Sequence, residues 1–155
     1  MTINNMKIIF IDIDGVLNSE AYSSTTGGGI AFIEKKLVNN LKKIIEATGA
    51  KVVVTSRANA MLGKDFNNKR LDGIRQYGVE ILDSISQAYY TDFAESKAYP
   101  IRRWMEKNGC GDASFVVIDD CPSNLEMEFG DRYIRVSGKH GLSPRHVKKV
   151  IEILK

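Results

Sequence analysis

The sequence is poor in cysteine and histidine, and it contains no long hydrophobic run. Two cysteines, Cys110 and Cys121, among 155 residues are too few for a disulfide framework or a metal cluster. Two histidines leave little to bind zinc, so an oxygen-ligated metal is the class that remains. The apolar run near the N-terminus is short and is interrupted by Asp12 and Asp14, which excludes a signal-peptide core or a membrane span there. We therefore expect a cytoplasmic protein that does not enter a membrane.

The sequence also has no strong excess of positive over negative charge. A net charge of +3 and a pI near 8.8 are typical of a solvated surface and do not by themselves indicate nucleic-acid binding. Hydrophobic residues make up 43% and charged residues 26%, which is ordinary for a soluble globular protein. At 155 residues the natural count is one domain with one core, so we expect a single domain over residues 1–155.

What the sequence does have is a hydrophobic segment that ends in two carboxylates. Residues 6–11 are apolar at nearly every position, which is typical of a central strand in a parallel sheet. Asp12 and Asp14 follow at the carboxyl end of this strand, the edge where open α/β sheets bind ligands. Two ionised carboxylates in one crevice require a cation such as Mg²⁺. Gly15 allows a sharp turn or a close approach to a ligand, although Asp and Gly at a strand end also serve turns alone.

A second apolar strand is expected over residues 51–54, and it also ends in polar residues. The hydroxyl of Thr55 and the adjacent backbone N–H can donate to a phosphoryl oxygen, Ser56 follows, and Arg57 carries a fork of donors suited to phosphate. The alternative is that Thr55 simply favours a strand, Ser56 caps the next helix and Arg57 lies on the surface.

A later apolar strand over residues 115–118 ends in a second acidic pair, Asp119 and Asp120. One aspartate is enough to cap the following helix, so two exceed what a cap needs. The alternation of apolar strands with amphipathic helices predicts an α/β three-layer sandwich with a parallel sheet. The other expected elements are a helix over 34–48, an interrupted helical region over 59–77, a third strand over 79–82, a helix beginning near 100, a fifth strand over 133–136 and a helix over 143–154.

Two loops near the strand ends carry less specific signals. Residues 18–29 are polar and glycine-rich but lack the lysine and hydroxyl of a P-loop, so we expect a flap over the strand ends. The stretch 83–94 contains Tyr89, Tyr90 and Phe93, which either contact a substrate base or pack on the sheet edge, the commoner use of aromatic clusters.

The order of these motifs resembles that of the haloacid dehalogenase (HAD) superfamily over the whole chain. The stretch 12–16 is similar to the first family motif, Thr55 to the second, Lys97 before a helix to the third, and the pair 119–120 to the fourth. The resemblance implies a Rossmann-like fold with five mainly parallel strands in the order 5-4-1-2-3. Because neither usual insertion point holds a long segment, it also implies a minimal cap or none.

The resemblance further implies an aspartyl-phosphate phosphatase. Asp12 would be the nucleophile and Asp14 the general acid and base, while Thr55 and Lys97 would bind the transferring oxygens. Gly15, Ser56 and Arg57 would lie next to the substrate, and Arg102 and Arg103 are the alternatives to Lys97. Mg²⁺ would be held by Asp12, by the backbone carbonyl of Asp14 and by Asp119 or Asp120.

The substrate implied by the resemblance is a phosphomonoester. The chain is similar to compact HAD domains of RNA repair proteins, although Arg57 follows Ser56 directly where that subfamily has Trp-Arg. An RNA or DNA end carrying a 3′-phosphate is therefore one expected substrate, and a small metabolite or nucleotide is the alternative. Two non-enzyme readings stay open, a receiver-like switch phosphorylated at Asp83 and an inactive binding module on the same fold. The segments that carry the subfamily similarity are residues 12–18, residues 55–57, Ile101 with Trp104, and residues 141–143.

Overall fold

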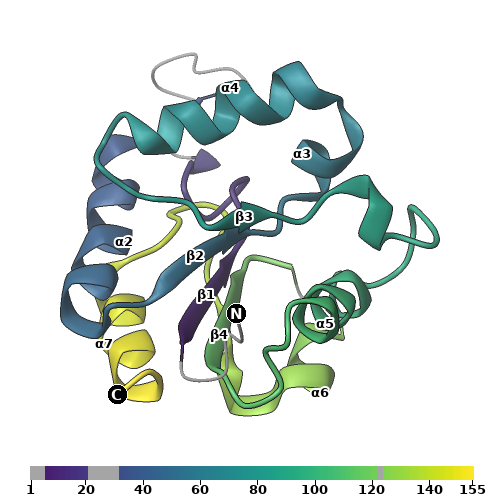
Figure 1. Ribbon diagram of the computed structural model, residues 1–155. Helices are drawn as coiled ribbons and strands as arrows, with labels where there is room; N and C mark the ends of the chain where they lie inside the picture. Colours follow the sequence, from purple (N-terminus) through teal and green to yellow (C-terminus); the bar gives the residue numbers. More distant parts are fainter. Residues whose placement is uncertain (1–5, 21–31, 122–123) are drawn as a thin grey trace.

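Figure 1 shows the computed structural model, in which residues 6–20, 32–121 and 124–155 are described. Five parallel strands form one sheet in the order β3-β2-β1-β4-β5. This order, counted from the other edge, is the expected 5-4-1-2-3. Receiver domains have the order 2-1-3-4-5, so the sheet rules out the receiver-like reading. The strands are β1 (Lys7–Ile11), β2 (Lys51–Val54), β3 (Asp83–Ser84), β4 (Ser114–Asp119) and β5 (Tyr133–Arg135).

Helices cover both faces of the sheet, which makes the expected three layers (Figure 1). Because side chains alternate along β1, Ile9 and Ile11 join one core cluster, and Ile8 and Phe10 join the other. Helices α2, α4 and α7 contribute to the first cluster, and α5 and α6 contribute to the second. The helices are α2 (Lys35–Thr48), α3 (Arg57–Met61), α4 (Lys64–Arg75), α5 (Ala98–Lys107), α6 (Leu125–Phe129) and α7 (Pro144–Ile153), with 3-10 turns η1 (Gln87–Tyr89) and η2 (Gly130–Arg132).

The third strand is where the expectation from sequence was wrong. Residues 79–82 do not form a strand, and β3 lies just beyond them. Val79 is buried in the core cluster to which α2, α4 and α7 contribute, and Ile81 packs against that cluster. The chain reaches the sheet edge only at Leu82, whose N–H donates to the Val52 carbonyl at 2.8 Å. The apolar residues Val79 and Ile81 therefore pack against the helices. The polar residues that follow, Asp83 and Ser84, form the backbone pairing with β2.

The helical expectations hold with small shifts. The region 59–77 is divided into α3 and α4 at Gly63, which has a φ of 98° and so breaks the helix. Ser143 caps α7, and Pro144 occupies its first position. Most of the expected flap lies outside the described residues, as does Pro122. No helix in the described ranges is long and apolar enough to cross a membrane.

Candidate active site

Three carboxylates meet at the carboxyl ends of β1 and β4. Asp12, Asp119 and Asp120 each have a carboxylate oxygen within 4.8 Å of the others. The backbone holds the two strand ends in register, because the Asp12 N–H donates to the Ile118 carbonyl at 3.0 Å. Neighbouring parallel strands present their carboxyl ends at one edge, and this brings residues far apart in sequence together.

Lys97 is the cation of this acidic cluster. Its Nζ lies 3.2 Å from Asp12 Oδ2 and 3.0 Å from Asp119 Oδ2. Lys97 directly precedes α5, so the start of that helix positions the ammonium. The two alternatives are engaged elsewhere, since Arg102 pairs with Glu128, and Arg103 pairs with Glu95 at 2.6 Å.

Burial and charge shift the ionisation of these groups. Burial raises the pKa of Asp12 to about 7, with Lys97 acting against this rise and Asp119 adding to it. Burial and the neighbouring Asp119 also raise the pKa of Asp120 to about 6. Burial alone would lower the pKa of Lys97, but Asp12 and Asp119 raise it above its usual value. The ammonium therefore remains charged at neutral pH, while ionising both Asp12 and Asp120 calls for more positive charge.

The acidic cluster fits a divalent cation. Its donors are all carboxylate oxygens, the ligands that Mg²⁺ prefers, and Lys97 balances only one of three carboxylate charges. Asp12 and Asp119 are buried, so solvent does little to screen their mutual repulsion. The raised pKa values of Asp12 and Asp120 are consistent with too little positive charge near these carboxylates.

Asp14 is not one of the three clustered carboxylates and has other partners. Its Oδ2 pairs with Arg70 Nη2 at 3.0 Å, and its Oδ1 accepts a hydrogen bond from Asn18 Nδ2 at 3.1 Å. Asn18 Oδ1 also accepts from the Gly15 N–H at 3.0 Å, which ties the loop after β1 together. The carboxylate of Asp14 is 45% exposed, in contrast to the buried Asp12.

Arg70 is a residue of the site that sequence reasoning missed. It is fully buried on α4, and its guanidinium lies 5.2 Å from the Phe66 ring centroid. The available signal was its spacing, because Arg70 precedes the buried Ile74 by four residues and so lies on the apolar face of α4. An arginine on such a face is buried only when it is paired.

Position 15 must be glycine because the Asp120 carboxylate occupies the space where a side chain would begin. Its φ is 81°, and a Cβ atom built on it would overlap the Asp120 carboxylate. A Cβ on Gly138 would also approach Asp120 Oδ2, to 2.9 Å. The two glycines therefore leave room for the Asp120 carboxylate, which follows β4, to enter the site.

The polar residues after β2 have different partners. Thr55 is 2% exposed, and its Oγ1 has no hydrogen-bond partner among the described residues, which leaves it available to a ligand. Ser56 caps α3, because its Oγ accepts from the Asn59 N–H at 3.2 Å. Arg57 Nη2 donates to the Glu95 carbonyl at 2.6 Å, and its Nε has no partner within the described chain.

The aromatic residues after β3 divide between the two alternatives. Tyr89 and Tyr90 are partly buried against the core cluster around α5, as packing predicts, whereas Phe93 is 64% exposed. Burial raises the pKa of Tyr90, Lys97 and Arg57 lower it, and Asp12 raises it, so the phenol lies within range of charges at the site. The Arg57 guanidinium carbon lies 5.9 Å from the Tyr90 ring centroid, so this segment borders the polar residues that follow β2.

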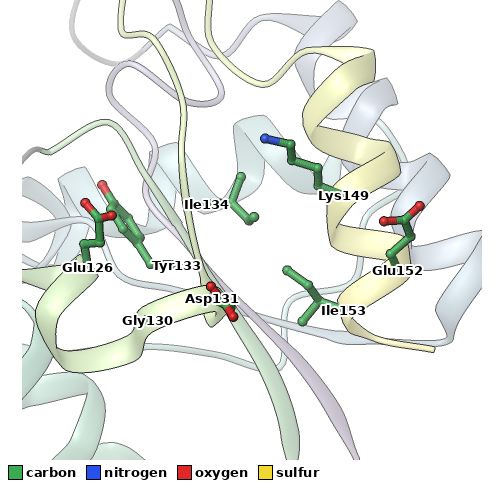
Figure 2. A pocket seen from close by; sticks show the side chains of 8 residues that line it. All are labelled: Glu126, Gly130, Asp131, Tyr133, Ile134, Lys149, Glu152 and Ile153. Carbon is green, nitrogen blue, oxygen red and sulfur yellow. The ribbon is translucent and has the colours of Figure 1, made fainter.

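Another pocket lies beside the edge strand β5 (Figure 2), and none of the three clustered carboxylates lines it. Its volume is about 640 Å³, and it opens between the start of β5, the turn after α6, and α7. In Figure 2, Glu126 and Tyr133 lie on one side, and Lys149 and Glu152 lie on the other. With Asp131 the pocket holds three carboxylates against one lysine, a balance that disfavours a phosphate.

Comparisons with known proteins agree with this geometry. A sequence model described as the HAD domain in Swiss Army Knife RNA repair proteins matches residues 8–147. A search of curated proteins finds no match. A solved structure described as a candidate HAD-like phosphatase from Mesorhizobium loti is similar in fold, with a TM-score of 0.56 and 14% identity over 99% of this chain and 88% of that one.

Proposed function

We propose that this chain, which belongs to the family of HAD domains found in Swiss Army Knife RNA repair proteins, is a Mg²⁺-dependent phosphomonoester hydrolase. The observation that carries the proposal is the convergence of Asp12, Lys97, Asp119 and Asp120 at one edge of the sheet. A buried carboxylate beside an ammonium and two further carboxylates suits a nucleophile whose target is an anionic phosphoryl group.

The first half of the reaction forms a covalent intermediate on Asp12. A carboxylate oxygen of Asp12 attacks phosphorus, a new P–O bond forms, and the bond from phosphorus to the leaving oxygen breaks. Asp14 donates a proton to that leaving oxygen, which departs as an alcohol. Arg70 and Asn18 orient the Asp14 carboxylate before the transfer.

The second half releases phosphate and restores the enzyme. Asp14 takes a proton from water as the water oxygen attacks phosphorus, and the bond from phosphorus to Asp12 breaks. Lys97 and the unpartnered Thr55 hydroxyl donate to the phosphoryl oxygens in both steps. The backbone at Gly15 and the donors of Ser56 and Arg57 border the bound substrate.

Mg²⁺ would be held by the side chains of Asp12 and of Asp119 or Asp120, with the Asp14 backbone carbonyl. When bound, the ion offsets the repulsion between the Asp12 carboxylate and the phosphate dianion. Lys97 alone leaves this repulsion partly uncompensated.

The preferred substrate class is a nucleic-acid end that carries a 3′-phosphate. The family description supports this class, because it refers to RNA repair proteins. A small metabolite or a nucleotide is the alternative, and a screen of 3′-phosphorylated oligonucleotides, nucleotides and sugar phosphates separates them. Preferential turnover of sugar phosphates would contradict the nucleic-acid class.

Hydrolysis of p-nitrophenyl phosphate tests the activity itself. We expect turnover that needs Mg²⁺ and stops with EDTA, and a loss of about a thousand-fold or more in the Asp12→Asn variant, because the nucleophile is removed. Asp131→Asn is the matched control, since it makes the same chemical change in the pocket of Figure 2, outside the acidic cluster. Binding of Mg²⁺ without turnover of any phosphomonoester would instead indicate an inactive binding module.

A further inference from the structure

A second pocket lies next to Arg57, which follows β2, and its lining differs in chemical character from the acidic cluster. Its volume is about 320 Å³, and it is lined by Met61, Gln87 and residues 90–93. Tyr90 connects the pocket to the residues that follow β2, because it lines the pocket while the Arg57 guanidinium carbon lies 5.9 Å from its ring centroid.

The pocket wall carries an aromatic ring that the fold does not use. Phe93 is 64% exposed, although phenylalanine is usually buried. Arg57 extends this aromatic surface, with its guanidinium carbon 5.9 Å from the Tyr90 ring centroid. Exposed aromatic rings and arginine planes are surfaces on which nucleic-acid bases stack.

The loop that presents Phe93 is held in place on both sides. The Thr91 N–H and hydroxyl donate to the Glu95 carboxylate at 2.9 and 2.8 Å, and Arg103 donates to it at 2.6 Å. Arg103 also donates to the Tyr89 carbonyl at 2.8 Å. These charge-assisted hydrogen bonds hold the pKa of Glu95 at about 2, so the network persists at neutral pH. Phe93 is thus presented on an ordered loop.

The polar groups of the pocket fit a neutral base better than a second phosphate. Asp92 supplies a carboxylate, which repels phosphate but can accept a hydrogen bond from an exocyclic amine. Gln87 offers both a donor and an acceptor. The volume is at the lower end for ligand pockets, which suits one base and not a duplex.

We propose that this pocket binds the base of a nucleoside whose phosphate lies at Asp12, with Phe93 as the stacking residue. The inference rests on the proposed phosphatase function. It identifies the leaving group of that reaction as a nucleoside. The pocket selects phosphomonoesters of nucleosides over those of sugars and glycerol, because only the former have a planar aromatic group.

Steady-state kinetics of the full chain test the pocket. The variants are Phe93→Ala, Phe93→Trp and, as a control, Met127→Ala, which removes an exposed apolar side chain from α6. The substrates are a nucleoside 3′-monophosphate, a 3′-phosphorylated oligonucleotide and glycerol 2-phosphate. We expect Phe93→Ala to raise KM about ten-fold for substrates with a base and to leave glycerol 2-phosphate unchanged. Phe93→Trp should retain the wild-type KM.

The outcomes separate the pocket from the activity. A raised KM of Phe93→Ala for both nucleotide substrates supports the pocket and indicates that it accepts the base of a free nucleotide. A raised KM for the oligonucleotide alone supports the pocket and indicates that it accepts the base at a strand end. An equal effect on glycerol 2-phosphate, or no effect on nucleotides, overturns it while the phosphatase stands. If the wild type hydrolyses no monoester, the proposed function fails, and calorimetric titration with adenosine decides the pocket. Binding that Phe93→Ala abolishes supports it, and absence of binding overturns it.

Discussion

At the scale of single residues, the close approach between Gly15 and Asp120 makes the site sensitive to one methyl group. Gly15→Ala should displace the Asp120 carboxylate and weaken Mg²⁺ binding about ten-fold or more, because the new Cβ would overlap that carboxylate. Titration calorimetry with Mg²⁺ measures the effect.

Gly49→Ala is the matched control for this substitution. Gly49 also has a positive φ, of 72°, but nothing lies within 4 Å of a Cβ built there. Both variants should lose about 1–2 kcal/mol of unfolding free energy from backbone strain. Mg²⁺ affinity should fall only in Gly15→Ala, and an equal fall in both variants would contradict the assignment.

The raised pKa values of Asp12 and Asp120 predict a pH-dependent metal affinity. Because protons compete with Mg²⁺ for these carboxylates, and their pKa values are about 7 and about 6, affinity should fall about ten-fold or more from pH 8 to pH 5.5. Calorimetric titrations at the two pH values measure this change. The same affinity at both would show that neither group binds the ion.

The free energy of unfolding should also depend on pH, in a direction that the raised pKa of Asp12 determines. In the metal-free protein the raised pKa of Asp12 means that the folded state binds its proton more tightly than the unfolded state does. The resulting stabilisation is present at acidic pH and is lost as pH rises through about 7. Mg²⁺ should therefore raise the melting temperature more at pH 8 than at pH 5.5.

At the scale of elements, α4 reaches the site through Arg70. We expect Arg70→Met, which keeps most of the buried volume, to lower kcat about ten-fold with little change in KM, because Asp14 loses a partner that orients it. Since Asp14 protonates the leaving group, the loss should be larger for glycerol 2-phosphate than for p-nitrophenyl phosphate, whose leaving group needs no proton.

Equal losses for the two substrates would indicate that Arg70 acts only on the fold. Leu62→Ala serves as the control in this region, because Leu62 is the C-cap residue after α3, lies just before α4 and is 57% exposed. It should leave both rates unchanged.

Some elements could be predicted from the sequence and others could not, for reasons that are local. The apolar strands before Asp12 and Asp119 are fully covered, so continuous hydrophobicity marked them. The short edge strand β3 consists of Asp83 and Ser84, which carry no strand signal, and it pairs only because the neighbouring apolar residues dock on the helices. Side-chain partnerships such as that of Asp14 with Arg70 depend on where α4 lies, which no local pattern encodes.

At the scale of the whole molecule, the parallel topology makes the site. The expected α/β sandwich is confirmed, and with it the meeting of two acidic strand ends at one edge. Because β1 pairs directly with β4, the Asp12 and Asp119 carboxylates become neighbours as soon as the sheet forms. Sequence order alone could suggest this meeting, but the strand order came from the resemblance and not from periodicity.

Mg²⁺ titration calorimetry of the wild type and of Asp119→Asn and Asp120→Asn tests the central claim most directly, with Asp131→Asn as the control. The account predicts one ion bound per chain and, in at least one of the two cluster variants, an affinity lowered by about ten-fold or more, with the control unchanged. Wild-type affinity in both cluster variants would contradict a metal centre built from the ends of β1 and β4.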